Sequence, residues 1–72
     1  MIGERIKELR TELCLSQAKV AKAIGYSQAS VQDWEVGNKR PTSEAIIVLA
    51  QFFNVTADYL LGLSNDYSKV IK

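Results

Sequence analysis

The chain has no histidine and only one cysteine, Cys14, among its 72 residues. A single chain of this composition can form neither an internal disulfide nor a zinc site of cysteine and histidine ligands. Catalysis that relies on histidine as an acid, a base or an activator of a nucleophile is excluded as well. We therefore expect a protein that is not an enzyme and that holds no metal and no cofactor.

Long apolar runs and a surplus of one charge are also missing. No stretch approaches the roughly 18 to 20 apolar residues needed to cross a bilayer, and the start MIGERIKELR is charged within its first turns. These features predict a cytoplasmic protein without a membrane partner. The formal net charge is +1 and the pI about 7.8, whereas strongly basic nucleic-acid-binding domains lie above a pI of roughly 9. If the chain binds DNA, the placement of its charges must matter more than their sum.

Hydrophobic residues make up 47% of the chain, which is typical of a small folded domain with one core. Apolar residues at intervals of four, three and four predict an amphipathic helix over residues 2–13, and they are Ile2, Ile6, Leu9 and Leu13. The core is further predicted to contain Val20, Ala21, Ile24, Val31, Trp34, Leu49 and Phe52.

Four more helices are predicted from the residues at their ends. A hydroxyl side chain suited to cap a helix start stands at Ser16, Ser27, Thr42 and Thr56. Apolar pairs with the spacing of a hydrophobic staple support three of these starts, namely Leu15/Val20, Tyr26/Val31 and Val55/Leu60. Residues that favour a left-handed helix end follow at Gly25, Gly37, Asn54 and Gly62. The predicted fold is all-α, a compact bundle of five short helices, with the last four near 17–24, 28–36, 43–53 and 57–61.

The predicted helix over 28–36 has two unlike faces. At about 100° per residue, Val31 and Trp34 fall on one side of the helix, opposite Gln28. A glutamine amide donates and accepts at once, which matches N6 and N7 of adenine in the major groove and contributes about 1 to 3 kcal/mol of discrimination. Gln28 is therefore a candidate for reading a base. The alternative interpretation is that it belongs to the exposed polar face of an ordinary small helical bundle.

Helices over 17–24 and 28–36 with a three-residue turn have helix-turn-helix spacing. In this arrangement the sequence resembles the lambdoid phage repressor and Cro type of helix-turn-helix, also called the xenobiotic-response-element family. The resemblance covers residues 4–62 and rests on Arg10, LSQAKVAKAIG at 15–25, SQASVQDWEVG at 27–37, Pro41 and LAQFFNVTADYLLG at 49–62. It implies a lambda-repressor-like domain over 1–62 with its DNA-binding motif at 17–36. In the tail at 63–72, apolar residues at offsets zero, four, seven and eight predict a short helix or a dimerisation segment, and the alternative is a frayed terminus.

The resemblance also implies roles for individual residues. The base-reading positions are occupied by Gln28, Ala29, Gln32 and Asp33, and the phosphate-binding positions by Gln17, Ser27, Asn38, Lys39 and Arg40. Arg10 and Glu35 resemble the structural ion pair that ties the first helix to the third. Asp33 departs from the neutral or basic residue usual there, and it weakens DNA binding unless it meets a donor such as N4 of cytosine. Cys14 stands where the family often has glycine or asparagine, which predicts a different turn or a strained backbone.

These observations predict a bacterial or phage transcriptional regulator, and a repressor first of all, that binds double-stranded DNA at an inverted-repeat operator as a homodimer. The candidate dimer contacts are Tyr59, Leu63, Tyr67, Val70 and Ile71. A rival prediction is an antitoxin or adaptor that uses the same fold to bind a protein partner, and the near-neutral net charge favours it.

Overall fold

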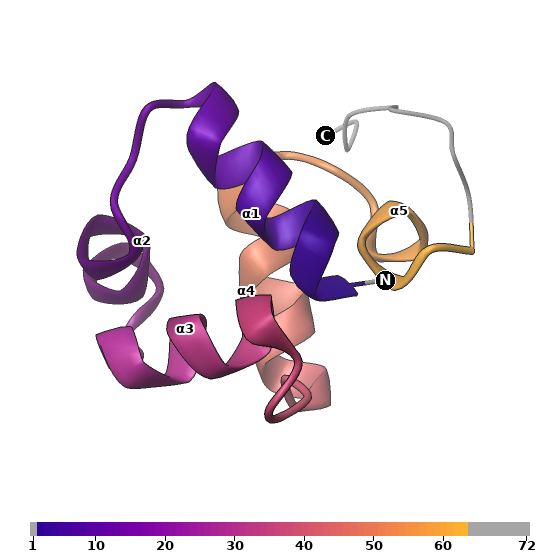
Figure 1. Cartoon of the computed structure of the whole chain (residues 1–72). Coiled ribbons are helices and arrows are strands. Elements are labelled where there is room, and N and C mark those ends of the chain that lie inside the picture. The colour runs from indigo at the N-terminus through magenta and orange to yellow at the C-terminus, as the bar shows by residue number, and fades with distance from the viewer. Residues whose placement is uncertain (1, 64–72) are drawn as a thin grey trace.

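The structure is a computed structural model that describes residues 2–63, and these residues form five helices joined by short loops (Figure 1). The helices are α1 (Ile2–Glu12), α2 (Gln17–Ile24), α3 (Gln28–Val36), α4 (Ser43–Phe53) and α5 (Ala57–Leu61). Within this part of the chain there is no strand, and the predicted all-α class and helix ranges are confirmed. The one boundary that differs is the end of α1, which lies at Glu12 rather than at residue 13.

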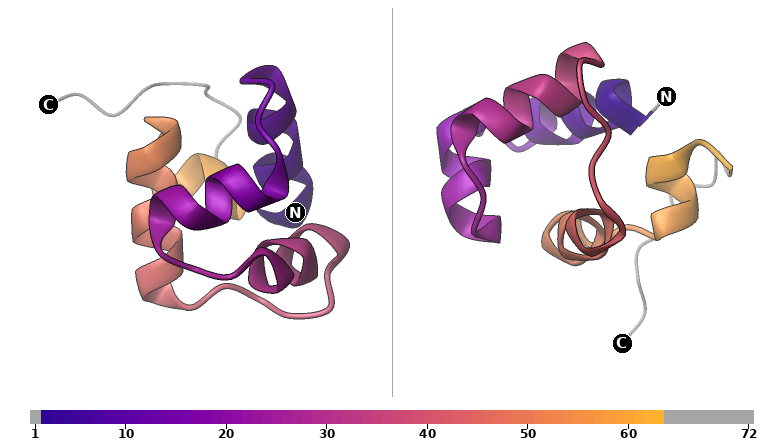
Figure 2. Two further views of the ribbon diagram at one scale, coloured as in Figure 1. Left: turned by 90° about the vertical axis from the view of Figure 1, so that its left-hand side faces the viewer. Right: turned by 90° about the horizontal axis from the view of Figure 1, so that it is seen from below.

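The helices close around one core because each packs on at least one that is distant in sequence. α1 contacts both α3 and α5, while α4 contacts α2 and α5. The start of α1 lies beside the end of α3 in all three ribbon views (Figures 1 and 2). α3 is therefore held between α1 and α2, with one side left open to solvent.

The core confirms most of the predicted apolar positions and corrects three. Its largest fully buried side chains are Ile6, Val20, Val31, Leu49, Val55 and Leu60. Phe53 is buried, whereas the predicted Ile24 and Phe52 are only half-buried and pack against the core, with Phe52 edge-on to Phe53. Leu13 was predicted to continue the apolar stripe of α1, but it is 54% exposed because the helix ends before it.

The predicted caps are confirmed at both ends of the helices. In each of α2 to α5 the hydroxyl at the start accepts a hydrogen bond from a backbone N–H three residues later, at 3.0 or 3.1 Å. All four predicted end residues are left-handed, with φ between 59° and 87°. Such caps satisfy backbone groups that the helix itself leaves unpaired, so they determine where each helix stops and how short the loops can be.

Cys14 is the strained position in the loop between α1 and α2. Its φ is 59°, in the left-handed region that disfavours residues with a Cβ atom. The turn is held in place because the N–H of Leu15 donates to the carbonyl of Arg10 at 3.0 Å. The prediction of backbone strain at this residue is therefore confirmed.

Replacing Cys14 by glycine is expected to raise the free energy of unfolding by about 1 kcal/mol. Relief of the left-handed strain exceeds the extra entropy that glycine gives the unfolded chain. Urea unfolding measures the effect, and Cys14→Ala, which removes the thiol but keeps the Cβ atom, serves as the control. Equal stability of the two variants would contradict the assignment of strain to the backbone.

Candidate nucleic-acid interface

The outward face of α3 carries the residues predicted to read bases. Gln28, Ala29 and Gln32 are exposed, and the side chain of Asp33 keeps 29% of its surface accessible. On the opposite face Val31 and Trp34 are buried, with Trp34 edge-on to Tyr26 at 5.2 Å between ring centroids. The apolar face anchors α3 to the core, and the four predicted base-reading residues lie together on the opposite, outward face of the helix.

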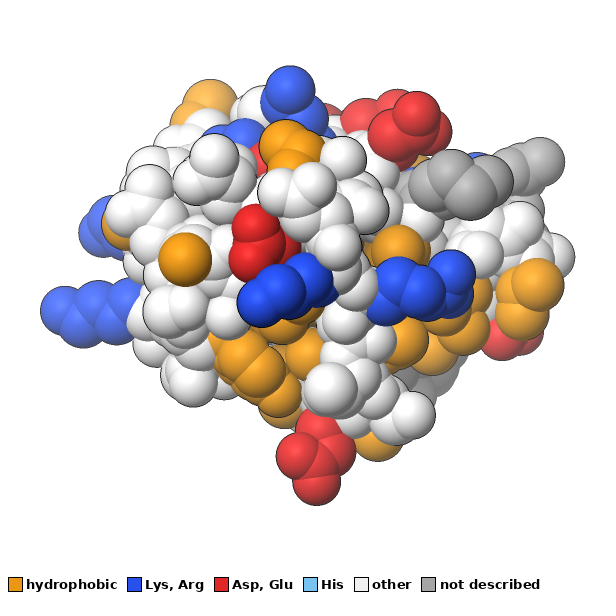
Figure 3. Space-filling model, turned by 60° about the horizontal axis from the view of Figure 1, so that its bottom comes forward, with side chains coloured by type: hydrophobic (Ala, Val, Ile, Leu, Met, Phe, Trp, Pro, Cys, Tyr) orange, Lys and Arg blue, Asp and Glu red, His pale blue; other side chains and the backbone are white. Residues whose placement is uncertain are grey.

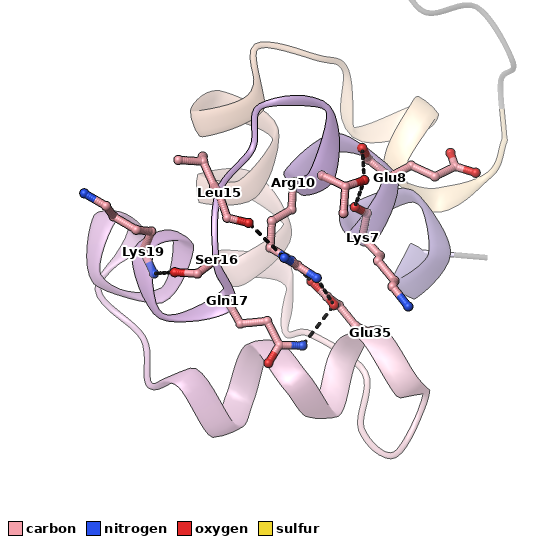
Figure 4. A network of polar contacts seen from close by, with 9 residues as sticks. Lys7, Glu8, Arg10, Leu15, Ser16, Gln17, Lys19 and Glu35 are labelled. Carbon is pink, nitrogen blue, oxygen red and sulfur yellow. Dashed lines mark hydrogen bonds and ion pairs between the residues drawn. The ribbon is translucent and has the colours of Figure 1, made fainter.

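Glu35, in the last turn of α3, lies against Arg10 of α1 (Figure 4). Arg10 donates from Nε to Oε2 of Glu35 at 2.7 Å and from Nη2 to Oε1 at 3.0 Å, and its Nη1 donates to the carbonyl of Leu15 at 2.8 Å. The two side chains are 13% and 2% exposed. This two-bond geometry fixes the orientation of α3 relative to α1.

The pKa of Arg10 reflects this environment. Its hydrogen bond to Glu35 raises the pKa, burial acts in the opposite direction, and the charge of Glu35 adds to the increase. Because the guanidinium is already charged at any physiological pH, this rise keeps Arg10 protonated and able to donate to Glu35.

Gln17, at the start of α2, joins the same cluster. Its Nε2 donates to Oε1 of Glu35 at 3.0 Å, so a residue predicted to bind phosphate also ties α2 to α3 (Figure 4). An amide NH2 carries two hydrogens, and the contact with Glu35 uses only one of them. Ser27, the other predicted phosphate ligand at a helix start, is exposed; its Oγ accepts from the N–H of Ser30 and lies 3.0 Å from the Ser30 hydroxyl.

The loop after α3 presents Asn38, Lys39 and Arg40, all exposed. The carbonyl of Asp33 accepts hydrogen bonds from the N–H groups of Gly37, Asn38 and Lys39 at 2.9 to 3.4 Å, which turns the loop back over the end of the helix. Lys39 Nζ lies 4.0 Å from Oδ2 of Asp33. The structure thus brings one predicted base-reading residue next to one predicted phosphate-binding residue, a proximity that the sequence reasoning missed.

The surface on this side is not uniformly basic. Seen from the side on which α3 lies, separate basic side chains stand among mostly uncharged surface, and one acidic side chain lies directly beside a basic one (Figure 3). This distribution agrees with the formal net charge of +1. Attraction to a nucleic acid must therefore come from a few cationic side chains at particular positions and not from a high net charge.

Two of the candidate dimer residues, Tyr59 and Leu63, lie in the described part of the chain, in α5 and just after it. Tyr59 of α5 is half-buried beneath the guanidinium of Arg5, which lies 4.2 Å from its ring centroid. Leu63 is 75% exposed. Tyr67, Val70 and Ile71 lie outside the described residues, as does most of the predicted tail 63–72.

Over residues 2–63 no group of three or more histidine, cysteine, aspartate or glutamate side chains is placed to hold a metal ion. In the same part of the chain, every helix is too short or too polar to cross a membrane.

Comparison with known proteins gives consistent matches to one family. A family model described as helix-turn-helix matches residues 6–60. An uncharacterised HTH-type transcriptional regulator of Bacillus subtilis, YobD, is 32% identical over 92% of the chain. Antitoxin PezA of Streptococcus pneumoniae is 33% identical over an alignment that covers 100% of the chain.

The repressor protein C2 of Salmonella phage P22 is similar in both sequence and structure. It is 33% identical over 85% of the chain. The crystal structure of the P22 c2 repressor in complex with a synthetic operator superposes with a TM-score of 0.80 and 32% identity, covering 83% of this chain and 91% of that one. The chain spans 59%, 49% and 28% of the lengths of YobD, PezA and C2, respectively.

Replacing Glu35 by alanine is expected to lower the free energy of unfolding by about 3 kcal/mol, because the partly buried guanidinium of Arg10 loses its carboxylate. The double variant Arg10→Ala with Glu35→Ala should lose at least about 1 kcal/mol less than the sum of the single variants. Denaturant unfolding of all four proteins measures this coupling, with exposed Glu8→Ala as the control for loss of a carboxylate. Strict additivity would show that the two side chains do not act as a pair.

Proposed function

This chain belongs to the helix-turn-helix family, and from that premise we propose that it is a sequence-specific regulator of transcription, specifically a repressor, that binds double-stranded DNA in the cytoplasm. The observation that carries the proposal is the open polar face of α3, which α1 and α2 hold rigidly from behind. The P22 c2 repressor, to which this chain is similar in fold, was solved in complex with a synthetic operator.

Each residue on the open face has a chemical partner on a base edge. Gln28 and Gln32 match the paired donor and acceptor of adenine, and the methyl group of Ala29 fits against that of thymine. Asp33 is suited to accept a hydrogen bond from N4 of cytosine. Together these four side chains form the proposed reading surface, which faces the major groove.

Phosphates would be bound on both sides of this reading surface. Gln17 and Ser27 stand at the starts of α2 and α3, where unpaired N–H groups and the helix dipole favour an anion. Asn38, Lys39 and Arg40 follow the end of α3 and would contact the other strand. Each phosphate that a cation neutralises releases counterions, so these contacts make binding depend on salt.

The ion pair of Lys39 with Asp33 does not prevent Lys39 from reaching a phosphate. The lysine side chain is 76% exposed, and an exposed pair of this kind contributes only about 0.2 to 1 kcal/mol. When Lys39 moves to a phosphate, Asp33 loses its cation and is left near the negative DNA backbone. Cytosine at the facing position would then compensate Asp33, which makes this residue a source of specificity rather than of affinity.

The proposed regulator acts as a homodimer on an inverted repeat. α3 has nine residues and is about 13 Å long, which corresponds to roughly four base pairs. One such helix reads too few bases to define an operator, whereas two related by a two-fold axis double the information. α5 and the segment from Leu63 onward, including Tyr59, Tyr67, Val70 and Ile71, supply the proposed interface.

A second candidate function is that of an antitoxin or adaptor that binds a protein partner. The match to antitoxin PezA covers the whole chain, and the net charge of +1 is low for a domain that binds only nucleic acid. The two functions are separated by electrophoretic retardation of DNA from the protein's own upstream region at low salt. Failure of folded protein to retard this DNA, together with a co-purifying toxin-sized protein, would favour the second function.

Lys39→Ala and Arg40→Ala are each expected to reduce the slope of log affinity against log salt by about one. The reason is that each variant loses one phosphate contact, and the loss should be similar on all DNA sequences. Fluorescence anisotropy at several salt concentrations measures the slope. Lys7→Ala removes the same charge from the exposed face of α1 and should leave the salt slope unchanged. If Lys7→Ala lowers the slope equally, the slope depends on the net charge of the protein and not on the positions of Lys39 and Arg40.

Gln28→Ala is expected to relax specificity at one base pair in each half-site, because it removes a bidentate contact to adenine worth about 1 to 3 kcal/mol. Selection of bound sites from a random DNA library with the native chain and with the variant measures this directly. Loss of preference at a single adenine, with the rest of the site unchanged, is the expected outcome. If the variant selects the same site as the native chain, Gln28 does not read a base.

A further inference from the structure

Gly3 marks a place where two backbones meet without a side chain between them. It is buried in the first turn of α1, and a Cβ atom at this position would overlap the carbonyl oxygen of Trp34 and lie 3.0 Å from that of Glu35. Both of these carbonyls belong to the last turn of α3. Because main-chain atoms cannot turn aside as a side chain can, any residue other than glycine must push the two helices apart.

The same contact borders the predicted phosphate-binding loop. Gly3, Val36, Lys39 and Arg40 line one shallow hollow between the start of α1 and the end of α3. Figures 1 and 2 show these two helix ends side by side from three directions. A displacement of the last turn of α3 at Gly3 would therefore carry the two basic residues with it.

The last turn of α3 has a second attachment to α1, of a different kind. Glu35 binds Arg10 through long side chains, which can change rotamer and keep their hydrogen bonds over a range of helix positions. The ion pair thus orients α3 but tolerates small shifts. The backbone contact at Gly3 supplies the closest approach, which the ion pair alone does not define.

We propose that Gly3 is a positioning residue for DNA binding: the absence of a side chain there lets the last turn of α3 seat against α1 and so places Lys39 and Arg40 where they meet phosphates. This proposal rests on the DNA-binding function proposed above. Gly3 does not itself contact DNA. Its effect reaches the DNA through the backbone of α3 and the loop that follows.

The test is Gly3→Ala, made in both the native and the more stable Cys14→Gly background, with DNA selected from a random library by the native chain. We expect a folded protein whose affinity falls at least tenfold and whose salt slope is shallower by one to two. Adding Lys39→Ala and Arg40→Ala to Gly3→Ala should cause much less further loss than the same pair causes in the native chain, since neighbours that act together are not additive. Thr11→Ala, a neutral change at an exposed position of α1, is the matched control and should leave affinity and slope unchanged.

Amide chemical shifts of the free variant provide a readout that does not depend on DNA. We expect the changes to spread from residues 2–5 to residues 34–40. Changes confined to the start of α1, an unchanged salt slope, full additivity with the loop variants or global unfolding in both backgrounds would each overturn the proposal. If the native chain binds no DNA at all, the proposed function fails, and the chemical shifts still decide whether Gly3 positions the loop.

Discussion

The carboxylate of Glu35 is the point on which the arrangement of α1, α2 and α3 depends. With only 2% of its side chain exposed, it accepts two hydrogen bonds from Arg10 of α1 and one from Gln17 of α2. Burial of a charge removes much of the energy that its ion pair returns. The main effect of this cluster is therefore orientation: it holds both helices of the motif in one geometry relative to α1.

This geometry explains how a nearly neutral chain could present the proposed nucleic-acid interface. The apolar side of α3 is fixed by Val31 and Trp34, and its last turn by Glu35, so the outward polar face does not have to organise itself when a ligand arrives. A preorganised surface loses little entropy on binding. A few cations at fixed positions can then supply the attraction to phosphates that a large positive net charge supplies in other domains.

The sequence predicted most of the fold because its signals are local. A capping hydroxyl and a left-handed residue act within one turn of the helix, and each of the four pairs of caps lies where its residues indicate. The errors arose where the apolar period alone does not decide. Leu13 continues the apolar period of α1, but the turn at Cys14 ends the helix before it, and the choice between Phe52 and Phe53 depends on how α4 is rotated against its neighbours.

For the candidate site, the sequence predicted which side chains face outward but not the contacts among them. The resemblance to a family placed Gln28, Gln32 and the loop cations on one surface, yet it did not bring Lys39 to Asp33 or Gln17 to Glu35. The close approach at Gly3 has no signature in periodicity or charge, since a glycine in a first helical turn suits many environments. A contact between main-chain atoms of two helices can be recognised only in the three-dimensional structure, where both helices are positioned.

The proposed reading surface on α3 is tested most directly by a map of amide chemical-shift changes when the labelled chain is titrated with duplex DNA selected from a random library. The changes should centre on the starts of α2 and α3, the outward face of α3 and residues 38–40, and each bound duplex should carry an inverted repeat. Changes centred on α4 and α5, or selected duplexes that share no sequence, would contradict this proposal.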